Sequence, residues 1–422
     1  MSFTKYRLGD IATISISGVD KKAHKGEIPV KLCNFVDVYY NWAITKELYP
    51  SFMSATAKQN EIDEFTIHKG CVAITKDSET RDDIGVATYI ADDFDETVVL
   101  GYHTALITPN PDILDGSYLN ALLHTSLFQR YWYNNASGSG QRYTLGIEAM
   151  QDAMVYLPDI SIQRRIGEAF STLEKKISIL EKENRELEAL AKQVHDYWFI
   201  QFEFPNSQGK PYRTSGGEME YSPLLKRDIP KGWEVQNLPY IAKFTNGVAC
   251  QKFRPSGKDK GIPVIKILDM HSKRLNPTER VRSDIPESVM VHNGDILFSW
   301  SASLEVMIWA YGEGGLNQHI FKVTTNHGFP KYFVYYQLLN YVQNFRRIAE
   351  SRKTTMGHIT SDHLKQSTIA VPTNKSICAE FDKRVSPIFD KFINNCKEIK
   401  ALGDFREYIL PLLMNGQATI AD

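Results

Sequence analysis

The sequence predicts an α+β protein in which two similar domains of mixed strands and helices are joined by two long helices that form an antiparallel coiled coil. Three observations predict this fold. The chain of 422 residues is too long for one ordinary hydrophobic core. Its two halves contain the same short motifs in the same order. Each half also ends in a heptad pattern of apolar residues, which is typical of coiled-coil helices.

Composition and charge are those of an ordinary globular protein. Apolar residues make up 42% of the sequence, charged residues make up 23%, and the formal net charge is −1. No apolar run approaches the roughly 20 residues of a membrane-spanning helix. The first residues also lack the apolar core of a signal peptide. We therefore expect a cytoplasmic protein with no membrane partner.

The cysteines predict buried, reduced thiols. Their number is odd and no two have Cys-x-x-Cys spacing, which disfavours both disulfides and a zinc site. The five positions are Cys33, Cys71, Cys250, Cys378 and Cys396.

The globular parts of the two halves share strand motifs. An Ile-Pro-Val phrase introduces a strand at residues 28–30 and again at residues 262–264. A His-x-Gly turn precedes another strand at residues 68–70 and again at residues 292–294. The repeat therefore predicts two domains with the same order of strands.

The repeat continues through a histidine and a helix. His103 and His319 occupy matching places in strand-like runs. Each run is followed by an amphipathic helix rich in aromatic residues, at residues 118–132 and 332–348. Where the two halves differ in length, the extra residues fall in loops. This pattern is expected when a variable surface is carried by a constant framework.

Each half ends in a heptad pattern that predicts a long helix. We expect antiparallel pairing with Asn184 facing Asn395, because a buried asparagine fixes the register of a coiled coil. Arg406 is expected to extend toward the end of the coil. The alternative is that each helix belongs to the core of an ordinary domain. The core positions are Ile166, Phe170, Leu173, Ile177, Leu180, Asn184, Leu187, Ala191, Val194 and Trp198, then Phe381, Val385, Ile388, Phe392, Asn395, Ile399, Leu402, Arg406 and Ile409.

The expected helices are long enough to separate two reading domains on one extended partner. A helix of about 36 residues spans ~54 Å, whereas one turn of DNA spans ~34 Å. Residues 250–260, 273–282 and 346–353 each carry four basic groups against one acidic group. A phosphate backbone responds to such local charge and not to the total. The alternative is a solvated surface with scattered charge.

Residues 198–235 begin with WFIQFEFPNSQGKPY and end with IPKGWEV. This segment resembles the central segment of the DNA-specificity subunit of type I restriction–modification systems. The phrases GDILFSW at 294–300, LNQHIFKV at 316–323 and REYILPLLMNGQ at 406–417 are similar to that family as well. The resemblance covers essentially the whole chain.

This resemblance implies a non-catalytic subunit that reads a bipartite, asymmetric site on double-stranded DNA. It implies that the coiled coil sets the spacer and docks two methyltransferase subunits, and that motor-nuclease subunits join the assembly. S-adenosylmethionine would then be bound by the methyltransferase, and ATP and Mg²⁺ by the motor-nuclease, with no cofactor on this chain. The expected parts are a first target-recognition domain at 1–158, a helix at 159–200, a linker at 201–232, a second target-recognition domain at 233–373, and a second helix with the tail at 374–422.

Candidate DNA contacts are basic and polar residues of the expected loops. Arginine favours guanine, while asparagine and glutamine favour adenine, because each pairs with its base through two hydrogen bonds in the major groove. The alternative for residues 134–144 is a flexible connector. Candidate phosphate contacts are Lys21, Lys22, Lys25, Arg142, Lys252, Arg254, Lys258, Arg346, Arg347, Arg352 and Lys353, and candidate base readers are Gln141, Arg142, Tyr143, Ser299, Ser301, Thr354, Thr355 and His358.

Motifs for methyl transfer and for DNA translocation are missing from the sequence. There is no Asn/Asp-Pro-Pro-Tyr/Phe motif and no GxxxxGK[ST] loop. The acidic residues between Asp77 and Glu96 could bind Mg²⁺, but a solvated loop is the simpler interpretation. His103 and His319 are expected to be structural, and we expect no catalytic or metal site. Two alternatives remain: a self-contained DNA-modifying enzyme with a divergent active site, and a protein scaffold with no DNA role.

Overall fold

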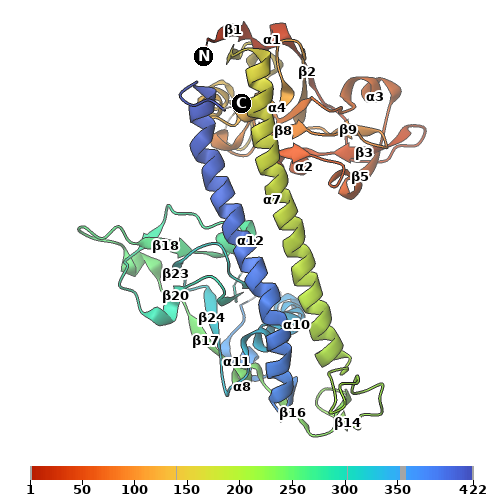
Figure 1. Cartoon of the computed structure of the whole chain (residues 1–422), viewed down its shortest axis with the longest axis vertical. Helices are drawn as coiled ribbons and strands as arrows, with labels where there is room; N and C mark the ends of the chain where they lie inside the picture. The colour runs from red at the N-terminus through yellow and green to blue at the C-terminus, as the bar shows by residue number, and fades with distance from the viewer. Residues whose placement is uncertain (1, 139, 302, 352–357, 421–422) are drawn as a thin grey trace. The chain divides into compact units, whose positions relative to one another are not determined.

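The computed structural model describes residues 2–138, 140–301, 303–351 and 358–420. It divides into two compact units, one made of residues 1–178 with 402–422 and the other made of residues 179–401 (Figure 1). Both units mix strands with helices, so the expected α+β class is confirmed.

The first unit contains thirteen strands and short helices among its described residues. The strands are β1 (Thr4–Arg7), β2 (Ala12–Ile16), β3 (Ile28–Cys33), β4 (Ala43–Ile44), β5 (Met53–Ala57), β6 (Val72–Thr75), β7 (Asp77–Ser78), β8 (Ala87–Ile90), β9 (Val98–Leu100), β10 (Thr104–Pro109), β11 (Ser137–Gly138), β12 (Tyr143–Thr144) and β13 (Met154–Leu157). The helices are α1 (Leu8–Ile11), α2 (Phe35–Tyr40), η1 (Tyr49–Ser51), α3 (Gln59–Phe65), η2 (Arg81–Asp83), α4 (Gly116–Leu123), α5 (Ser126–Asn135) and α6 (Ile147–Gln151).

The main sheet of the first unit has the strand order β2-β10-β6-β8-β4. Its central strand β6 is buried along its whole length, as expected for a continuous apolar run covered on both faces. A second sheet has the order β5-β3-β9, a third has the order β11-β12-β7, and β1 pairs with β13.

The second unit begins within the first long helix and follows the same plan. Its strands are β14 (Met219–Ser222), β15 (Arg227–Pro230), β16 (Trp233–Gln236), β17 (Ala242–Asn246), β18 (Ile262–Ile265), β19 (Arg280–Val281), β20 (Met290–Val291), β21 (Ile296–Ser299), β22 (Glu305–Ile308), β23 (Gly314–Leu316), β24 (Ile320–Thr325) and β25 (Ile369–Pro372). Its helices are the π-helix η3 (Asp196–Ile200), α8 (Leu238–Ile241), η4 (Cys250–Phe253), α9 (Ile267–Ser272), η5 (Glu287–Val289), α10 (Lys331–Ser351) and α11 (Ser361–Lys365).

Strand pairing confirms the internal repeat. The order β17-β24-β21-β22 in the second unit reproduces β2-β10-β6-β8 in the first. The pairs β3–β9 and β18–β23 are both parallel, and β16–β25 reproduces β1–β13. The two sequences therefore build one frame twice.

The aromatic helix differs between the units. We expected one helix over residues 118–132, but the first unit divides it into α4 and α5. His124 ends α4, and the Thr125 side chain then accepts a hydrogen bond from the backbone N–H of Phe128, which starts a new helix as an N-cap does. In the second unit α10 is continuous over the described residues.

The two long helices are α7 (Ile160–His195) and α12 (Ser376–Met414), and each contributes to both units. They lie side by side in the second unit, where the Asn395 amide donates to Asn184 Oδ1 over 3.0 Å (Figure 1). The rings of Trp198 and Phe381 are 6.0 Å apart in the same unit. Later residues of α7 thus meet earlier residues of α12, which is the expected antiparallel pairing.

In the first unit the helix pair is closed by an ion pair that the heptad pattern does not show. Arg406 Nη1 lies 2.5 Å from Glu174 Oε1, and its guanidinium lies over the Trp42 ring at 4.9 Å. Trp42 also stacks on His124 at 4.1 Å. Arg406 therefore does not extend to the end of the coil as expected, because a carboxylate and an aromatic face hold it within the unit.

Two remaining predictions concern the cysteines and membrane segments. All five cysteines are free and buried, as expected. None of the helices in the described ranges combines the length and apolar character that crossing a membrane requires.

Candidate nucleic-acid interface

Polar side chains of the first unit gather where β6 ends and β10 begins. The backbone N–H of Lys76, directly after β6, donates to the His103 carbonyl over 2.9 Å. The N–H of Leu145 donates to the Lys76 carbonyl over 2.8 Å. Strand β12 pairs with β7, so Thr144 lies opposite Asp77. Three segments that are distant in sequence are therefore fastened together by backbone hydrogen bonds.

The side chains at this place form a charged cluster around Asp77. Its carboxylate lies 2.6 Å from His103 Nδ1 and 3.2 Å from Lys76 Nζ. Burial alone would raise the pKa of the Asp77 carboxyl, but hydrogen bonds from Thr144, His103 and Lys76 outweigh it and lower the pKa below its usual value. Asp77 is therefore ionised at neutral pH. Arg142 Nη2 completes the cluster, 3.1 Å from His103 Nε2.

The second unit builds the same place with the same backbone contacts. The Trp300 N–H donates to the His319 carbonyl over 3.3 Å, and the Ile359 N–H donates to the Trp300 carbonyl over 3.0 Å. Trp300 thus corresponds to Lys76, His319 to His103, and His358 to Thr144. The two histidines that the repeat singled out do occupy equivalent positions.

The side chains of the second unit at this place are aromatic and amide groups. The Trp300 ring lies 5.6 Å from both His319 and His358, and its Nε1–H donates to Asn246 Oδ1 over 3.0 Å. Gln318 Nε2 approaches His319 Nε2 at 3.4 Å. We call these matching clusters the charged edge of the first unit (Lys76, Asp77, His103, Arg142, Thr144) and the aromatic edge of the second (Asn246, Trp300, Gln318, His319, His358).

The predicted basic loops lie next to these edges. The loop that carries Lys21, Lys22 and Lys25 is fastened by a hydrogen bond from the Tyr102 N–H to the Val19 carbonyl over 2.8 Å. All three lysines are exposed.

The basic loop of the second unit occupies the corresponding place. The Val248 N–H donates to the Leu316 carbonyl over 2.8 Å, and Lys252, Arg254 and Lys258 on the same loop are exposed. In both units, exposed cations therefore flank the edge.

The structure places several other predicted residues away from the edges or in the protein interior. Ser299 is fully buried, and its hydroxyl accepts from the Glu305 N–H over 2.9 Å and donates to the Ser303 carbonyl. It has no surface to offer a base, so we no longer assign it to a reading surface. Ser301 is also buried. Arg346 is exposed but donates to the Leu304 carbonyl.

The other predicted loop residues have mixed placements. Gln141 and Arg347 are exposed, and Tyr143 is half-buried under the guanidinium of Arg81 at 5.2 Å. Arg352, Lys353, Thr354 and Thr355 lie outside the described residues.

Sequence reasoning missed five members of the edges: Lys76, Thr144, Asn246, Trp300 and Gln318. Lys76 and Trp300 each follow a strand that the repeat had aligned, and this position is their only sequence signal. Asp77 had been seen only as one of the acidic residues from 77 to 96.

Other carboxylates of that acidic segment are used in the fold. Asp83 accepts from the Tyr39 hydroxyl over 2.6 Å, Asp92 accepts from the Lys46 N–H over 3.1 Å, and Asp93 accepts from the Lys69 N–H over 3.0 Å. Within the ranges that the structure describes, no group of three or more His, Cys, Asp or Glu side chains is arranged to hold a metal ion.

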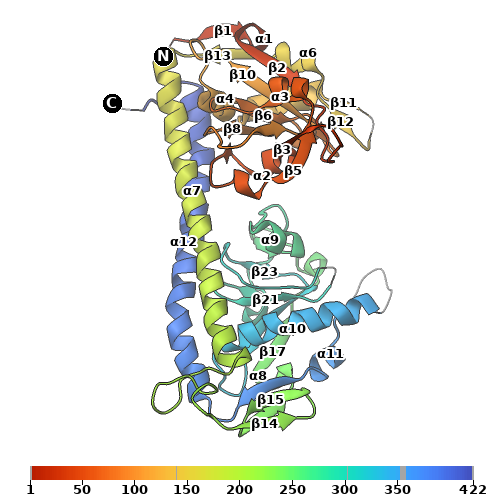
Figure 2. The ribbon, with the colours of Figure 1, turned by 90° about the vertical axis from the view of Figure 1, so that its right-hand side faces the viewer.

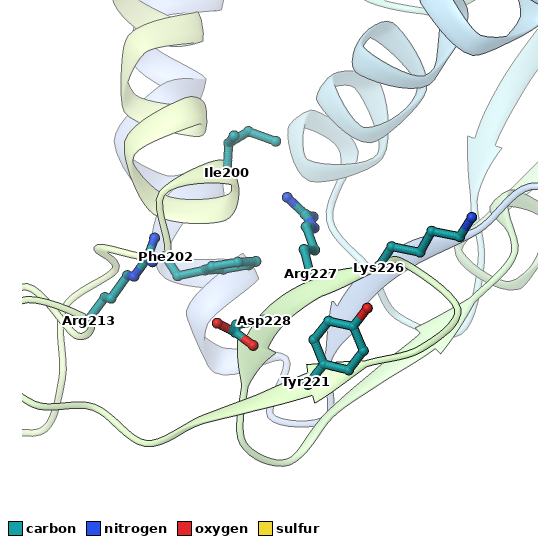
Figure 3. A pocket seen from close by; sticks show the side chains of 7 residues that line it. All are labelled: Ile200, Phe202, Arg213, Tyr221, Lys226, Arg227 and Asp228. Carbon is teal, nitrogen blue, oxygen red and sulfur yellow. The ribbon is translucent and has the colours of Figure 1, made fainter.

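A hollow of about 410 Å³ lies in the segment after the first long helix and shares no residue with either edge. Figure 3 shows its lining, in which the Arg227 guanidinium lies over the Phe202 ring at 5.2 Å. Phe202 and Lys226 have positive φ angles of 63° and 52°, which non-glycine residues seldom adopt. The lining residues are Ile200, Phe202, Arg213, Tyr221, Lys226, Arg227 and Asp228.

The repeat also agrees with a known domain. A family model described as the type I restriction modification DNA specificity domain matches the chain over residues 2–189 and again over residues 230–403. The chain belongs to this family. Each match includes a globular part and most of the long helix that follows it. The specificity domain therefore consists of both.

Curated relatives of this specificity-family member match most of its length at low identity. The MjaIX specificity subunit of Methanocaldococcus jannaschii is 24% identical over 314 residues, which cover 72% of this chain and 69% of that protein. The HindI specificity subunit of Haemophilus influenzae is 22% identical over 395 residues, which cover 81% of this chain and 85% of that protein.

A solved structure agrees with the fold. The S subunit of a type I restriction–modification system from M. genitalium superimposes with a TM-score of 0.55 at 12% identity, covering 98% of this chain and 96% of that one. At this identity the likeness concerns the fold alone.

Proposed function

We propose that this specificity-family member is the DNA-reading subunit of a type I restriction–modification complex, and that each repeat reads one half of a bipartite site. One observation carries the proposal: the same edge is built twice on the same backbone contacts, with charged groups in one repeat and aromatic and amide groups in the other. A frame that is kept while its side chains change is what two different half-sites require.

In this proposal, partner subunits carry out the methylation and cleavage reactions. Two methyltransferase subunits bind S-adenosylmethionine and methylate adenine, and motor-nuclease subunits bind ATP and Mg²⁺ and cleave DNA. This chain contributes recognition and assembly in the cytoplasm and carries no catalytic residue. The absence of methyl-transfer and phosphate-loop motifs from the sequence supports this division.

A domain exchange tests the proposal. Residues 1–158 are replaced by the equivalent domain of another family member, and the chimera is expressed with the methyltransferase subunit in a host without adenine methylation. Methylome sequencing should show one new half-site and one unchanged half-site. Exchange of residues 233–373 is the matched control and should change only the other half. A change in both halves from either exchange would contradict the proposal.

Purified protein separates the proposal from its alternatives. The isolated chain should transfer no methyl group from S-adenosylmethionine, and methylation should appear when the methyltransferase subunit is added. Methylation by the chain alone would favour a self-contained enzyme. A scaffold with no DNA role would show no steep loss of DNA affinity with salt, whereas phosphate contacts produce one.

The long helices are proposed to set the spacer between the half-sites. One heptad is inserted in α7 between Ser178 and Ile179, and one in α12 between Ala401 and Leu402, where the two units meet in sequence. Seven residues add about 10 Å of helix and preserve the heptad register. The methylome should show a spacer longer by about three base pairs with both half-sites unchanged. Changed half-sites would count against this role.

A further inference from the structure

We propose that Arg142 reads a guanine in the half-site of the first repeat, and that His103, held by Asp77, positions it. The inference rests on the proposed function, because it names the residue that performs part of the reading. The observation behind it is that an exposed arginine contacts a half-buried histidine, which in turn is hydrogen-bonded to a half-buried carboxylate at the charged edge.

The donor and acceptor roles in this chain follow from the groups themselves. Arg142 Nη2 lies 3.1 Å from His103 Nε2 and 3.5 Å from Nδ1, so the guanidinium lies against the imidazole ring. An ionised carboxylate can only accept a hydrogen bond, so the His103 Nδ1–H donates to Asp77 over 2.6 Å. The carboxylate thus fixes the orientation of the ring that Arg142 contacts.

The backbone also fixes this geometry. His103 has a φ of 69°, in the left-handed region that non-glycine residues seldom adopt. The turn is secured on both sides, by the Lys76 N–H on the His103 carbonyl and the Gly101 N–H on the Cys33 carbonyl. His319, at the equivalent position, is not among the described residues with positive φ. The unusual backbone therefore occurs in the repeat whose histidine faces an arginine.

Arg142 is held in place but remains accessible. It directly precedes β12, which is paired with both β11 and β7, so its backbone is not part of a free connector. Figure 2 shows this hairpin at the rim of the first unit. The side chain is exposed. Its Nη2 contacts His103, and within the described residues no contact to Nε or Nη1 is found.

This arrangement suits guanine in the major groove. Guanine offers two acceptors, N7 and O6, to a single guanidinium, and this is the commonest specific contact of arginine with DNA. The other arginine nearby, Arg81, is engaged with aromatic rings, lying over Tyr143 at 5.2 Å and Tyr133 at 5.8 Å. Exposed lysines on the adjoining loop, Lys21, Lys22 and Lys25, would hold the flanking phosphates.

The first test is Arg142→Ala in the full chain, expressed with its methyltransferase subunit. One G·C pair of the first half-site should become unspecified in the methylome, while the other positions and the second half-site stay unchanged. In binding to the assembled complex, the wild type should prefer G·C at that pair by about 5- to 150-fold, and the variant should show no preference. Arg130→Ala, which removes an exposed arginine from α5, is the control and should relax no position.

Modified DNA identifies the contact. Replacing each guanine of the half-site by 7-deazaguanine removes the N7 acceptor and keeps base pairing. The substitution should weaken binding of the wild-type complex at one position and have no effect there on the Arg142→Ala complex. Equal sensitivity of both proteins at every position would overturn the inference, and so would a first half-site without guanine.

The positioning role of His103 has its own readout. His103→Phe removes the ring nitrogens that contact Arg142 and Asp77, and His103→Gln restores a polar side chain. The phenylalanine variant should still methylate a bipartite site but relax the Arg142 position, and the glutamine variant should recover part of the discrimination. A phenylalanine variant with full discrimination would exclude His103 from this role.

The proposed function and the inference about Arg142 would be contradicted by different results. If the exchange of residues 1–158 leaves both half-sites unchanged, the proposed function fails. If the exchange works and Arg142→Ala leaves every base pair specified, only this inference fails.

Discussion

The charged edge and the aromatic edge occupy the same place in the two repeats and have different chemistry. Lys76 and Trp300 both donate their backbone N–H to a histidine carbonyl and both accept at their own carbonyl from a returning segment. The Lys76 side chain then meets a carboxylate and a threonine hydroxyl. The Trp300 side chain meets an asparagine and two histidines.

This difference teaches where the frame ends and where the variable surface begins. Backbone hydrogen bonds fix the positions of the segments whatever side chains they carry. Side chains at those positions can then differ while the strand pairing stays the same. The helix pairs differ in the same way, with an asparagine pair in the second unit and an arginine–glutamate pair in the first.

The largest effect on stability is expected for the arginine–glutamate pair between the long helices in the first unit. Arg406→Leu should destabilise the first unit by about 3–5 kcal/mol, because it breaks a largely buried ion pair by removing one of its two partners. The heptad pattern alone predicts the opposite, since leucine suits a core position. Chemical denaturation, with hydrogen exchange assigned to each unit, measures the destabilisation.

The double variant Arg406→Leu with Glu174→Leu is the control for this prediction. It should recover most of the stability, because replacing both ion-pair partners by apolar residues is often neutral or stabilising. A single variant as stable as the wild type would show that the ion pair is dispensable.

A smaller effect concerns the frame that both edges share. Thr75 and Ser299 are fully buried at equivalent positions, and their hydroxyls accept from the N–H groups of Val86 and Glu305. Thr75→Val and Ser299→Ala should each cost their own unit about 1–3 kcal/mol, because a buried donor loses its partner. Urea denaturation measures this cost. The methylome of Ser299→Ala should keep both half-sites, and an altered base would make Ser299 a reader after all.

Salt dependence should be alike in the two repeats. Replacing Lys21, Lys22 and Lys25 by alanine should lower the slope of log K against log salt by about 0.9 for each phosphate that the variant no longer binds. The same replacement of Lys252, Arg254 and Lys258 should have a similar effect, and neither should relax a base. Fluorescence anisotropy across a salt series measures the slopes. A slope that changes for only one repeat would show that the two loops are not equivalent.

The smallest expected effect is a pH dependence of stability, which the charged edge should show and the aromatic edge should not. The pKa of Asp77 is lowered below its usual value of 3.8, so its charge stabilises the first unit above that pH and the contribution is lost as the pH falls through the lowered pKa. The wild type should therefore exceed Asp77→Asn in unfolding free energy by a constant amount from about pH 5 to pH 7, and by less at about pH 3. Ser301→Ala, at the equivalent place in the second unit, should show no such trend. A difference that grows on acidification would reverse the sign of this argument.

The sequence predicted the frame because periodic signals repeat. Apolar spacing located the two long helices and placed Asn184 opposite Asn395, and matching motifs aligned His103 with His319. These signals are local or occur twice, so one chain suffices to see them. The break at Thr125 also had a local signal, since threonine is a common N-cap.

The edges could not be predicted because their contacts join distant segments. Nothing near Trp300 in the sequence indicates Asn246. Ser299 was proposed as a base reader from its polarity, but its burial is decided by the strand that returns to it at Glu305. The left-handed backbone conformation of His103 could not be predicted from the type of residue at that position.

The first unit is assembled from the two ends of the chain. Leu410, Leu413 and Met414 of α12 belong to the same hydrophobic core as Leu8, Tyr118 and Phe170. During synthesis, the repeat that leaves the ribosome first must therefore wait for the last residues before its core can close, whereas residues 179–401 are contiguous. A premature stop codon near position 402 would thus disrupt the fold of the first unit and leave that of the second unit intact.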